Sequence, residues 1–408
     1  MRIADDRFFH LTYCTNIHPG ESWEAVFAGI ERYVPGLKQR LSPQKPFGIG
    51  LRLSDLAARE LLQGDALDGF KTWLGERGLY VFTINGFPYG GFHRQVVKDQ
   101  VYAPDWRAAA RVDYTLRLAR ILAALLPADI EGSISSVPIS YKPWFHNEAE
   151  RAAAFERASV NLARMAAELM SIRATTGRSL HIDVEPEPDC LLENSDETVE
   201  FFERWLLPVG GSWLASTLCI SPSEAQANLL AHIGVCYDTC HFALQYETPA
   251  AALSKLTGAG IRIGKVQLSA ALKASMPESA DERGAVIERL RPFAEPTYLH
   301  QIVERHADGS LHHHADLSTA TSPHPDAREW RVHFHVPIFS GEYGGIYSTR
   351  DDIAATLSVL RDTHACPHLE IETYTWEVLP SRLKVDLSRS IVREYEWVLN
   401  TFAPPPAH

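Results

Sequence analysis

The feature that most constrains the fold is a regular alternation of short strand-like stretches with longer helical patterns. β-Branched and aromatic residues concentrate at 10–16, 47–54, 78–87, 131–140, 179–188, 233–241, 261–269, 332–339 and 367–376. Consecutive strands separated by a helix pair in parallel. About eight such units, running from one end of the chain to the other, predict an α/β fold of the (β/α)8 TIM-barrel type. An open doubly wound sheet is the competitor, but no glycine-rich dinucleotide fingerprint follows the first strand.

We expect one domain over residues 1–408, since α/β barrels run long as single domains. The stretch 270–330 breaks the alternation after the seventh strand, so we predict an inserted loop or flap at the barrel mouth. It contains His312, His313 and His314. Consecutive side chains point apart, which favours a surface loop over a metal cluster.

Charge and cysteine usage limit the partners. The formal net charge of −12 disfavours a nucleic-acid or anionic-membrane surface, so neither partner is expected. No run of about 18 apolar residues exists to span a membrane. The N-terminal stretch lacks the apolar segment of a signal peptide, so the six scattered cysteines are expected to be reduced thiols in a cytoplasmic protein.

Polar residues gather where the predicted strands end, which in a barrel is the side of the active site. They are Thr15, Asn16 and His18, then Arg52, Asn85, Asp183, Glu185, Glu187, Asp238, His241, Gln267, His333, His335, Glu370 and Glu372. Strand alternation places Glu185 on one face of its strand and Glu372 on one face of another, opposite branched apolar neighbours. Together with Asp238 they put three acids around one axis. Their repulsion predicts one divalent metal ion, Mn²⁺, Mg²⁺, Zn²⁺ or Fe²⁺.

Each of these residues also has a structural interpretation. Asp238 at a strand exit is either a helix N-cap or a ligand. Glu187, before Pro188, is interpreted as a solvated loop charge, and Glu370 could pair with a core Arg or Lys. His333 is more typical of a hydrogen-bonded barrel residue than of a ligand.

The order of these groups resembles the xylose-isomerase-like TIM-barrel superfamily of sugar and sugar-phosphate isomerases and epimerases. The matching residues are Glu185 in "DVEPEP", Asp238 and His241 in "YDTCH", Gln267 in "KVQLS", His335 in "HVPIF" and Glu372 in "EIETYTW". More narrowly, "LTYCTNIHPGESWE", "NGFPYGGFH", "CYDTCH" and "ETYTWEVLP" look like the EboE metabolite-traffic family. That resemblance implies an ebo-type metabolite pathway and a functional link to a membrane prenyltransferase-like protein of the same operon.

The resemblance also implies roles for single residues. Glu185, Asp238, Gln267 and Glu372 would hold the metal, and Glu185 and Glu372 would transfer protons on opposite faces of the substrate. His241 would act on a substrate hydroxyl, and His335 would orient substrate or a second cation. Arg52, Asn85 and Lys265 would contact substrate. The cationic side chains of Arg52 and Lys265 would bind a phosphate or carboxylate group of that substrate. Gln267 stands where the superfamily commonly has His, so it can bind a cation through oxygen but cannot act as a base.

Three function classes remain open. The first is an isomerase or epimerase of a sugar, cyclitol or related polyol, moving a proton next to a carbonyl. The second is a non-catalytic metabolite-binding or traffic protein on the same barrel. The third is a phosphodiesterase of the endonuclease IV type, which the acidic charge disfavours.

Overall fold

The computed structural model describes residues 1–3, 8–320 and 323–403. Its larger sheet has the order β1-β2-β14-β8-β7-β6-β5-β4-β3, and every pairing except the antiparallel β1–β2 pair is parallel. The strands are β1 (Arg2–Ile3), β2 (Phe9–Tyr13), β3 (Phe47–Arg52), β4 (Leu79–Asn85), β5 (Gly132–Ser136), β6 (Leu180–Val184), β7 (Ile233–Asp238), β8 (Ile263–Leu268) and β14 (His368–Ile371).

The sheet closes where β2 meets β3. Cys14 and Gly50 form an isolated parallel bridge, and Thr12 Oγ1 donates to the Gly48 carbonyl at 3.0 Å. Gly50 is required at this seam, because a Cβ there would lie 1.7 Å from Glu370 Oε1 and 2.7 Å from the Tyr13 carbonyl oxygen. Eight parallel strands of the described residues, β2 to β8 and β14, therefore form a barrel, and the predicted (β/α)8 fold is confirmed.

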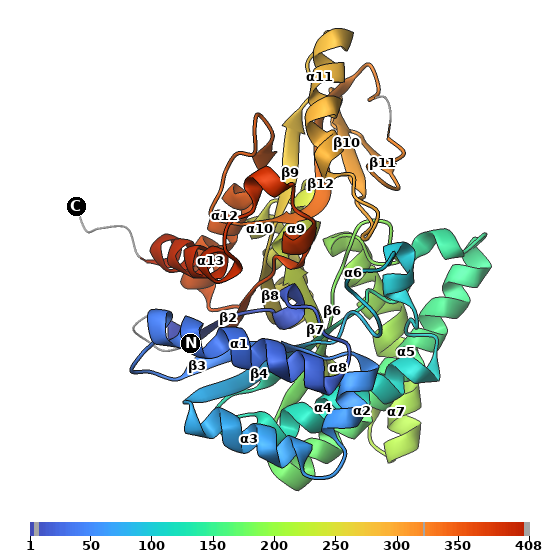
Figure 1. The fold of residues 1–408 in the computed structure, drawn as a ribbon. Helices are drawn as coiled ribbons and strands as arrows, with labels where there is room; N and C mark the ends of the chain where they lie inside the picture. The colour runs from blue at the N-terminus through green and yellow to red at the C-terminus, as the bar shows by residue number, and fades with distance from the viewer. Residues whose placement is uncertain (4–7, 321–322, 404–408) are drawn as a thin grey trace.

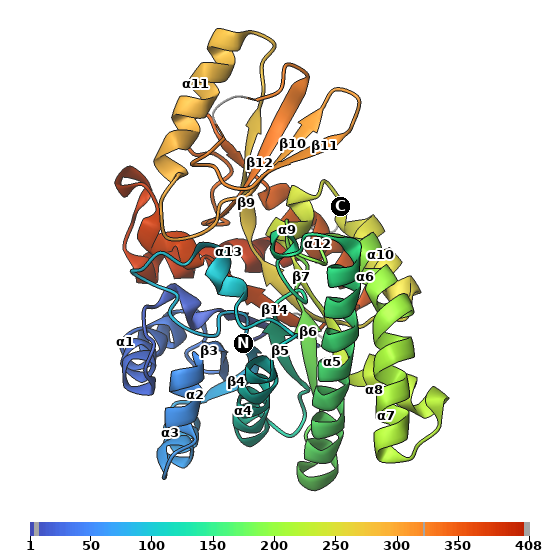
Figure 2. The same ribbon diagram turned by 90° about the vertical axis from the view of Figure 1, so that its right-hand side faces the viewer.

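Helices cover the outside of the barrel (Figures 1 and 2). They are α1 (Trp23–Leu41), α2 (Asp55–Leu61), α3 (Ala66–Glu76), α4 (Ala109–Leu125), α5 (Glu148–Thr176), α6 (Ser195–Phe201), the π-helix η4 (Phe202–Gly210), α7 (Gly211–Leu218), α8 (Pro222–His232), α9 (Thr239–Leu244), α10 (Pro249–Gly258), α12 (Arg350–Thr363) and α13 (Leu387–Phe402). Short 3-10 turns are η1 (Thr15–Ile17), η2 (Lys98–Tyr102), η3 (Lys142–Trp144), η5 (Arg291–Phe293), η6 (Tyr374–Val378) and η7 (Ser381–Leu383).

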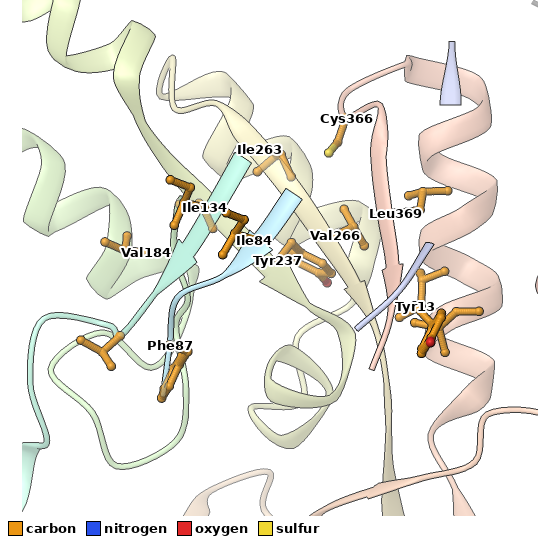
Figure 3. Close-up of a cluster of buried hydrophobic side chains, with 14 of the residues drawn as sticks. Tyr13, Ile84, Phe87, Ile134, Val184, Tyr237, Ile263, Val266, Cys366 and Leu369 are labelled. Atoms are coloured by element: carbon orange, nitrogen blue, oxygen red, sulfur yellow. The ribbon is translucent and has the colours of Figure 1, made fainter. Parts of the chain in front are cut away.

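Local sequence sets several helix ends. Ser22, Ser54 and Asn147 accept a backbone N–H three residues ahead and start α1, α2 and α5. Gly177, with φ of 70°, ends α5 in the left-handed conformation. Apolar side chains of the strands fill the layer between barrel and helices, and Figure 3 shows Ile84, Ile134 and Val184 from neighbouring strands in that layer.

The segment between β8 and α12 forms a second sheet of order β11-β10-β12-β9-β13. Its antiparallel strands are β9 (Ala270–Ser275), β10 (Ile302–His306), β11 (Leu311–His314), β12 (Ala327–Val336) and β13 (Tyr347–Ser348), with α11 (Ala280–Leu290) beside them. The sheet stands beyond the end of the barrel where β8 leads into β9 (Figures 1 and 2). The segment 270–330, predicted as an inserted loop or flap, thus contains short antiparallel strands and the helix α11 rather than loop alone. His312, His313 and His314 lie on strand β11 rather than in a loop.

Among the described residues, no helix has the length and apolar character needed to cross a membrane. All six cysteines are free thiols, and all but Cys219 are buried.

Candidate functional site

Three carboxylates meet at the carboxyl ends of the barrel strands. Glu185 follows β6, Asp238 ends β7 and Glu372 follows β14. One oxygen from each lies within 4.8 Å of the others, and all three residues are buried. The alternation of side chains along each strand explains why the two glutamates point into the barrel. Val184 and Ile371 pack in the apolar layer on one side of their strands, so Glu185 and Glu372, which follow them, face the other side.

The side-chain amide of Gln267, on β8, stands among the three acids. Its Nε2 donates to Glu185 Oε1 at 3.0 Å and to Asp238 Oδ2 at 3.2 Å, and also to Glu372 Oε2. The carbonyl oxygen of the same amide accepts a hydrogen bond from the Cys236 thiol at 3.4 Å. The nitrogen of Gln267, rather than its oxygen, therefore faces the acids in this structure.

Asp238 has the helix-cap role that was one of the two interpretations of its sequence position. Its Oδ1 accepts from the backbone N–H groups of Cys240 at 2.7 Å and His241 at 3.2 Å and so caps α9. Its Oδ2 faces the Gln267 amide. Because the cap uses one oxygen, the other stays available to the site.

The two glutamates differ in their partners. Glu372 Oε1 accepts from Asn16 Nδ2 at 2.7 Å and Asn85 Nδ2 at 2.8 Å. Glu185 Oε2, in contrast, is buried without a hydrogen-bond partner. A buried polar atom without a partner is costly, so this oxygen is the one most in need of a bound group.

Burial and mutual repulsion set the protonation of the acids. Burial, followed by the charges of its carboxylate neighbours, raises the pKa of Glu185 well above its usual range, and the same causes raise the pKa of Glu372. Burial acts in the same direction on Asp238, but His241 and His335, together with hydrogen bonds from the Ser269 hydroxyl and the His241 backbone, lower the pKa of Asp238. The cluster therefore combines an ionised aspartate with two glutamates that readily hold a proton.

Three imidazoles lie beside the carboxylates. His241 comes from α9, and His333 and His335 come from β12 of the second sheet. His333 Nε2 is 3.3 Å from His241 Nε2 and 3.2 Å from His335 Nε2. Burial lowers the pKa of His335 to about 4 and that of His333 well below its ordinary value.

Glu187 lies beside these imidazoles, and its interpretation as a solvated loop charge is wrong. It is 5 % exposed, accepts from Tyr102 Oη at 2.7 Å, and has Oε1 3.4 Å from His333 Nδ1. Its position on the inward face of "DVEPEP" was the signal that could have revealed it. His333 was likewise undervalued, because nothing local shows which strand would face it.

A cavity of about 50 Å³ opens onto both groups. Its floor includes Glu185, Glu372, His241, His333 and His335. Aromatic and apolar residues form much of the rest, among them Phe87, Pro88, Phe92, Val97, Val101, Tyr102, Tyr298, Leu299 and Tyr374. Lys98 is the one Lys or Arg among the described lining residues, and its Nζ contacts Asp316 at 2.8 Å and the Tyr298 carbonyl at 2.7 Å.

The other residues singled out from the sequence lie as follows. Asn85 lines the cavity, whereas Arg52 is buried outside it, donating to the Gly20 and Gly90 carbonyls and to Glu21. Lys265 forms a fully buried ion pair with Glu370 inside the barrel, as expected for a core pair. Neither cation reaches the cavity lining, so neither is placed to receive a substrate anion.

The carboxylate group fits a divalent cation on its own chemistry. Three buried acids lie within 4.8 Å of one another and one has an oxygen without a partner, so in their ionised forms a cation between them would relieve their repulsion. Carboxylate oxygens suit Mn²⁺ or Mg²⁺ and also bind Zn²⁺. Glu185, Asp238 and Glu372 would hold such an ion, whereas the carbonyl oxygen of Gln267 would reach it after a flip of the amide.

Comparisons with known proteins find solved structures that resemble this fold, but they find no match at the level of sequence. No protein-family model matches the sequence, and no curated protein matches it. An IolI protein with a bound zinc atom matches with 10 % identity over 97 % of this chain and 98 % of its own, at a TM-score of 0.49. A D-tagatose 3-epimerase-like protein matches with 11 % identity over 96 % and 98 %, at 0.48. A xylose isomerase-like TIM-barrel protein from Mycobacterium smegmatis in complex with magnesium matches with 10 % identity over 97 % and 96 %, at 0.48.

These likenesses carry no argument about the chemistry of this chain. Strand order and closure define it as a (β/α)8-barrel protein, and its mouth holds a buried carboxylate group next to three imidazoles.

Proposed function

We propose that the protein is a metal-dependent isomerase or epimerase that moves a proton next to the carbonyl of a sugar, cyclitol or related polyol. The observation that carries the proposal is the pairing of Glu185 and Glu372 around the Gln267 amide, with Asp238 between them. Shifting a proton between two carbons, or between two faces of one carbon, needs carboxylates that can accept and donate. Burial raises the pKa of both glutamates, which favours a carboxyl that can hold and release a proton.

The residues divide the work as follows. Asn16 and Asn85 orient Glu372, and Glu185, whose Oε2 has no hydrogen-bond partner, lines the cavity. A divalent cation held by the acids would polarise the substrate carbonyl and stabilise the negative charge left by the departing proton. His241 lines the cavity beside Glu185 and can donate to or accept from a substrate hydroxyl.

The wall of the cavity favours an uncharged substrate. Among the described lining residues, the one cation, Lys98, is engaged by Asp316 and Tyr298. A phosphate or phosphodiester would lack a free charged partner, which disfavours sugar phosphates and the nuclease alternative. The motif resemblance to EboE supports a role in an ebo-type metabolite pathway, with a functional link to a membrane prenyltransferase-like protein of the same operon.

The test is hydrogen exchange at carbon. Protein loaded with Mn²⁺ is incubated in D₂O with a panel of ketoses and inososes, and deuterium incorporation is followed by NMR. We expect exchange by wild type and a loss of at least about 100-fold in Glu185→Gln and Glu372→Gln, since general acid–base groups contribute about 10²–10⁴-fold. Glu304→Gln is the matched control, because Glu304 is a buried carboxylate on β10 of the second sheet.

Wild type that binds a panel member but exchanges no hydrogen would overturn the enzyme and support a binding or traffic protein. Exchange that survives in both glutamate variants would overturn the assigned roles.

A further inference from the structure

We propose that residues 94–98, here called the strap, form a gate over the cavity that Lys98 holds shut and that opens into a separate cleft on its outer side. The inference goes beyond the proposed function and rests on it only for the size of the ligand. The cavity measures about 50 Å³. One water takes about 30 Å³ of liquid, and a six-carbon polyol has about a dozen non-hydrogen atoms of similar size. Part of the cavity wall therefore has to move before such a molecule can enter.

The strap lies between two points where the chain is anchored. Just before it, His93 Nε2 donates to the Asn16 carbonyl at 2.7 Å. Just after it, Asp99 Oδ2 accepts from Trp144 Nε1 at 2.9 Å. In the middle of the strap, Val96 is 70 % exposed. The strap can therefore change position while the chain on either side of it stays in place.

The two ends of the strap have the backbone conformation of a strained hinge. Arg94 has a φ of 58° and Lys98 a φ of 45°, both in the left-handed region. Neither residue is glycine, so each conformation costs free energy that the surrounding contacts have to supply. Hinges in moving loops are a few residues that absorb the backbone rotation. Release of the contacts would let both residues return to ordinary backbone angles, which favours opening.

The contacts that hold the strap shut come from the second sheet and the segment that leads into it. The Thr297 carbonyl accepts from the backbone N–H groups of Val97 at 2.8 Å and Lys98 at 3.1 Å. Lys98 Nζ donates to the Tyr298 carbonyl at 2.7 Å and to Asp316 Oδ2 at 2.8 Å. Hydrogen bonds between charged groups are stronger than those between neutral ones. The ammonium group of Lys98 is therefore the main fastening of the strap.

A second cleft gives the strap room to move. It has a volume of about 260 Å³, and its lining includes Gln95, Val96 and Val97 of the strap. Val97, like Pro88 and Val101, also lines the inner cavity, so these side chains separate the two spaces. A shift of Val97 toward the outer cleft would join the two spaces and give a polyol a path to the carboxylates. Return of the strap would then exclude water from the reacting carbon.

Chemical labelling of the cavity histidines tests the gate without a substrate. Diethyl pyrocarbonate acylates neutral imidazoles and is about as large as a hexose. Labelling of His241, His333 and His335, which line the cavity, is followed by peptide mass spectrometry. In wild type we expect these histidines to react more slowly than His146, which is exposed, and faster than His368, which is buried on β14.

A variant of the fastening then changes one rate only. Lys98→Met removes the ammonium group and keeps an apolar side chain. We expect the cavity histidines to react about 10- to 100-fold faster, as loss of charge-assisted hydrogen bonds predicts, with His146 and His368 unchanged. Lys142→Met is the matched control, because the Lys142 side chain is 27 % exposed against 25 % for Lys98 and pairs with Glu193. It should leave every labelling rate as in wild type.

Hydrogen–deuterium exchange of the backbone locates the motion. The N–H groups of Val97 and Lys98 should exchange faster than those of β4, since local opening exposes them without unfolding the barrel. In Lys98→Met they should exchange faster again, by a factor similar to that for labelling. Faster labelling without faster exchange in the strap would place the opening elsewhere and overturn the gate.

Two results in wild type alone would also overturn the gate, whether or not Lys98→Met folds. Cavity histidines that react as fast as His146 would mean that the mouth is always open. Cavity histidines that react no faster than His368 would mean that only unfolding admits the reagent. Neither measurement uses a substrate, so failure of the gate would leave the proposed reaction standing, and absence of hydrogen exchange at carbon would leave the gate standing.

Discussion

Asp238 illustrates how one side chain can serve structure and chemistry at once. Since Asn caps a helix about as well as Asp, Asp238→Asn should keep α9 and the apo fold while removing a charge from Oδ2. We expect the affinity for Mn²⁺ to fall about 100-fold or more, because a lost charge close to a divalent ion costs several kcal/mol even at an effective dielectric of about 20. Calorimetric titration measures this change.

The matched control is Asp386→Asn, which makes the same substitution at the N-cap of α13. Equal Mn²⁺ affinity in wild type and Asp238→Asn would mean that Asp238 serves as a helix cap and not as a metal ligand.

Glu394 on α13 is a buried carboxyl outside the cavity lining. It accepts from Thr373 Oγ1 at 2.6 Å, one residue after Glu372, and burial raises its pKa to about 7. Between the ordinary value of 4.5 and about 7 the folded state binds the extra proton, so stability falls as pH rises through this range. At about 1.4 kcal/mol per pKa unit, the loss approaches about 3 kcal/mol above pH 7.

Glu394→Gln stays neutral and keeps an acceptor, so it should be more stable than wild type at pH 8 and nearly equal at pH 5. Urea unfolding at both values measures the difference. Glu31→Gln, on the exposed side of α1, is the control, and an equal gain at both pH values would contradict the assignment.

The residues of the carboxylate group could largely be predicted from the sequence, whereas most residues around them could not. Glu185 and Glu372 could be placed because strand alternation is local and puts acid and branched side chains on opposite faces. Glu187 and His333 could not, since their burial depends on a sheet folded from a distant segment. The orientation of the Gln267 amide could not be predicted from the sequence either, because it is set by hydrogen bonds to three acids from three other strands.

At the level of the elements, closure of the barrel depends on the bare backbone of Gly50. Gly50→Ala would place a methyl group against Glu370 and the Tyr13 carbonyl, so we expect a loss of about 1–3 kcal/mol or more in the free energy of unfolding. Chemical denaturation measures it. Gly36→Ala, in α1 with no atom within 4 Å of the added Cβ, should instead gain about 0.5–1 kcal/mol.

Destabilisation of equal size in both variants would mean that Gly50 has no special role in the seam.

The elements themselves were predictable where period and spacing are regular. Seven of the eight barrel strands lie within predicted stretches and β2 begins one residue earlier, at Phe9, because parallel strands flanked by helices leave a clear pattern. The second sheet left none: β10, β11 and β13 are short, and their turns are rich in polar residues. Strand 332–339 was recognised as β12, but its membership of another sheet follows from pairing with β9 and β10.

For the molecule as a whole, metal should stabilise the fold. Buried acids that repel one another oppose folding, and an ion bound only by the folded state adds about 2.7 kcal/mol at 100 times its Kd. We therefore expect Tm to fall on treatment with a chelator and to rise with the logarithm of added Mn²⁺. The double variant Glu185→Gln, Glu372→Gln should lose most of that dependence, and a Tm indifferent to Mn²⁺ in wild type would contradict metal binding at the acids.

The hydrogen bond from Asn16 to Glu372 joins residues 356 positions apart, and the contact of His241 with His333 spans 92. Long-range contacts form slowly, because closing such loops costs entropy before any contact repays it. The mouth of the barrel is thus complete only after both ends of the chain have met and the second sheet has docked. In a refolding experiment, ion capture would report the final step of assembly, well after secondary structure has formed.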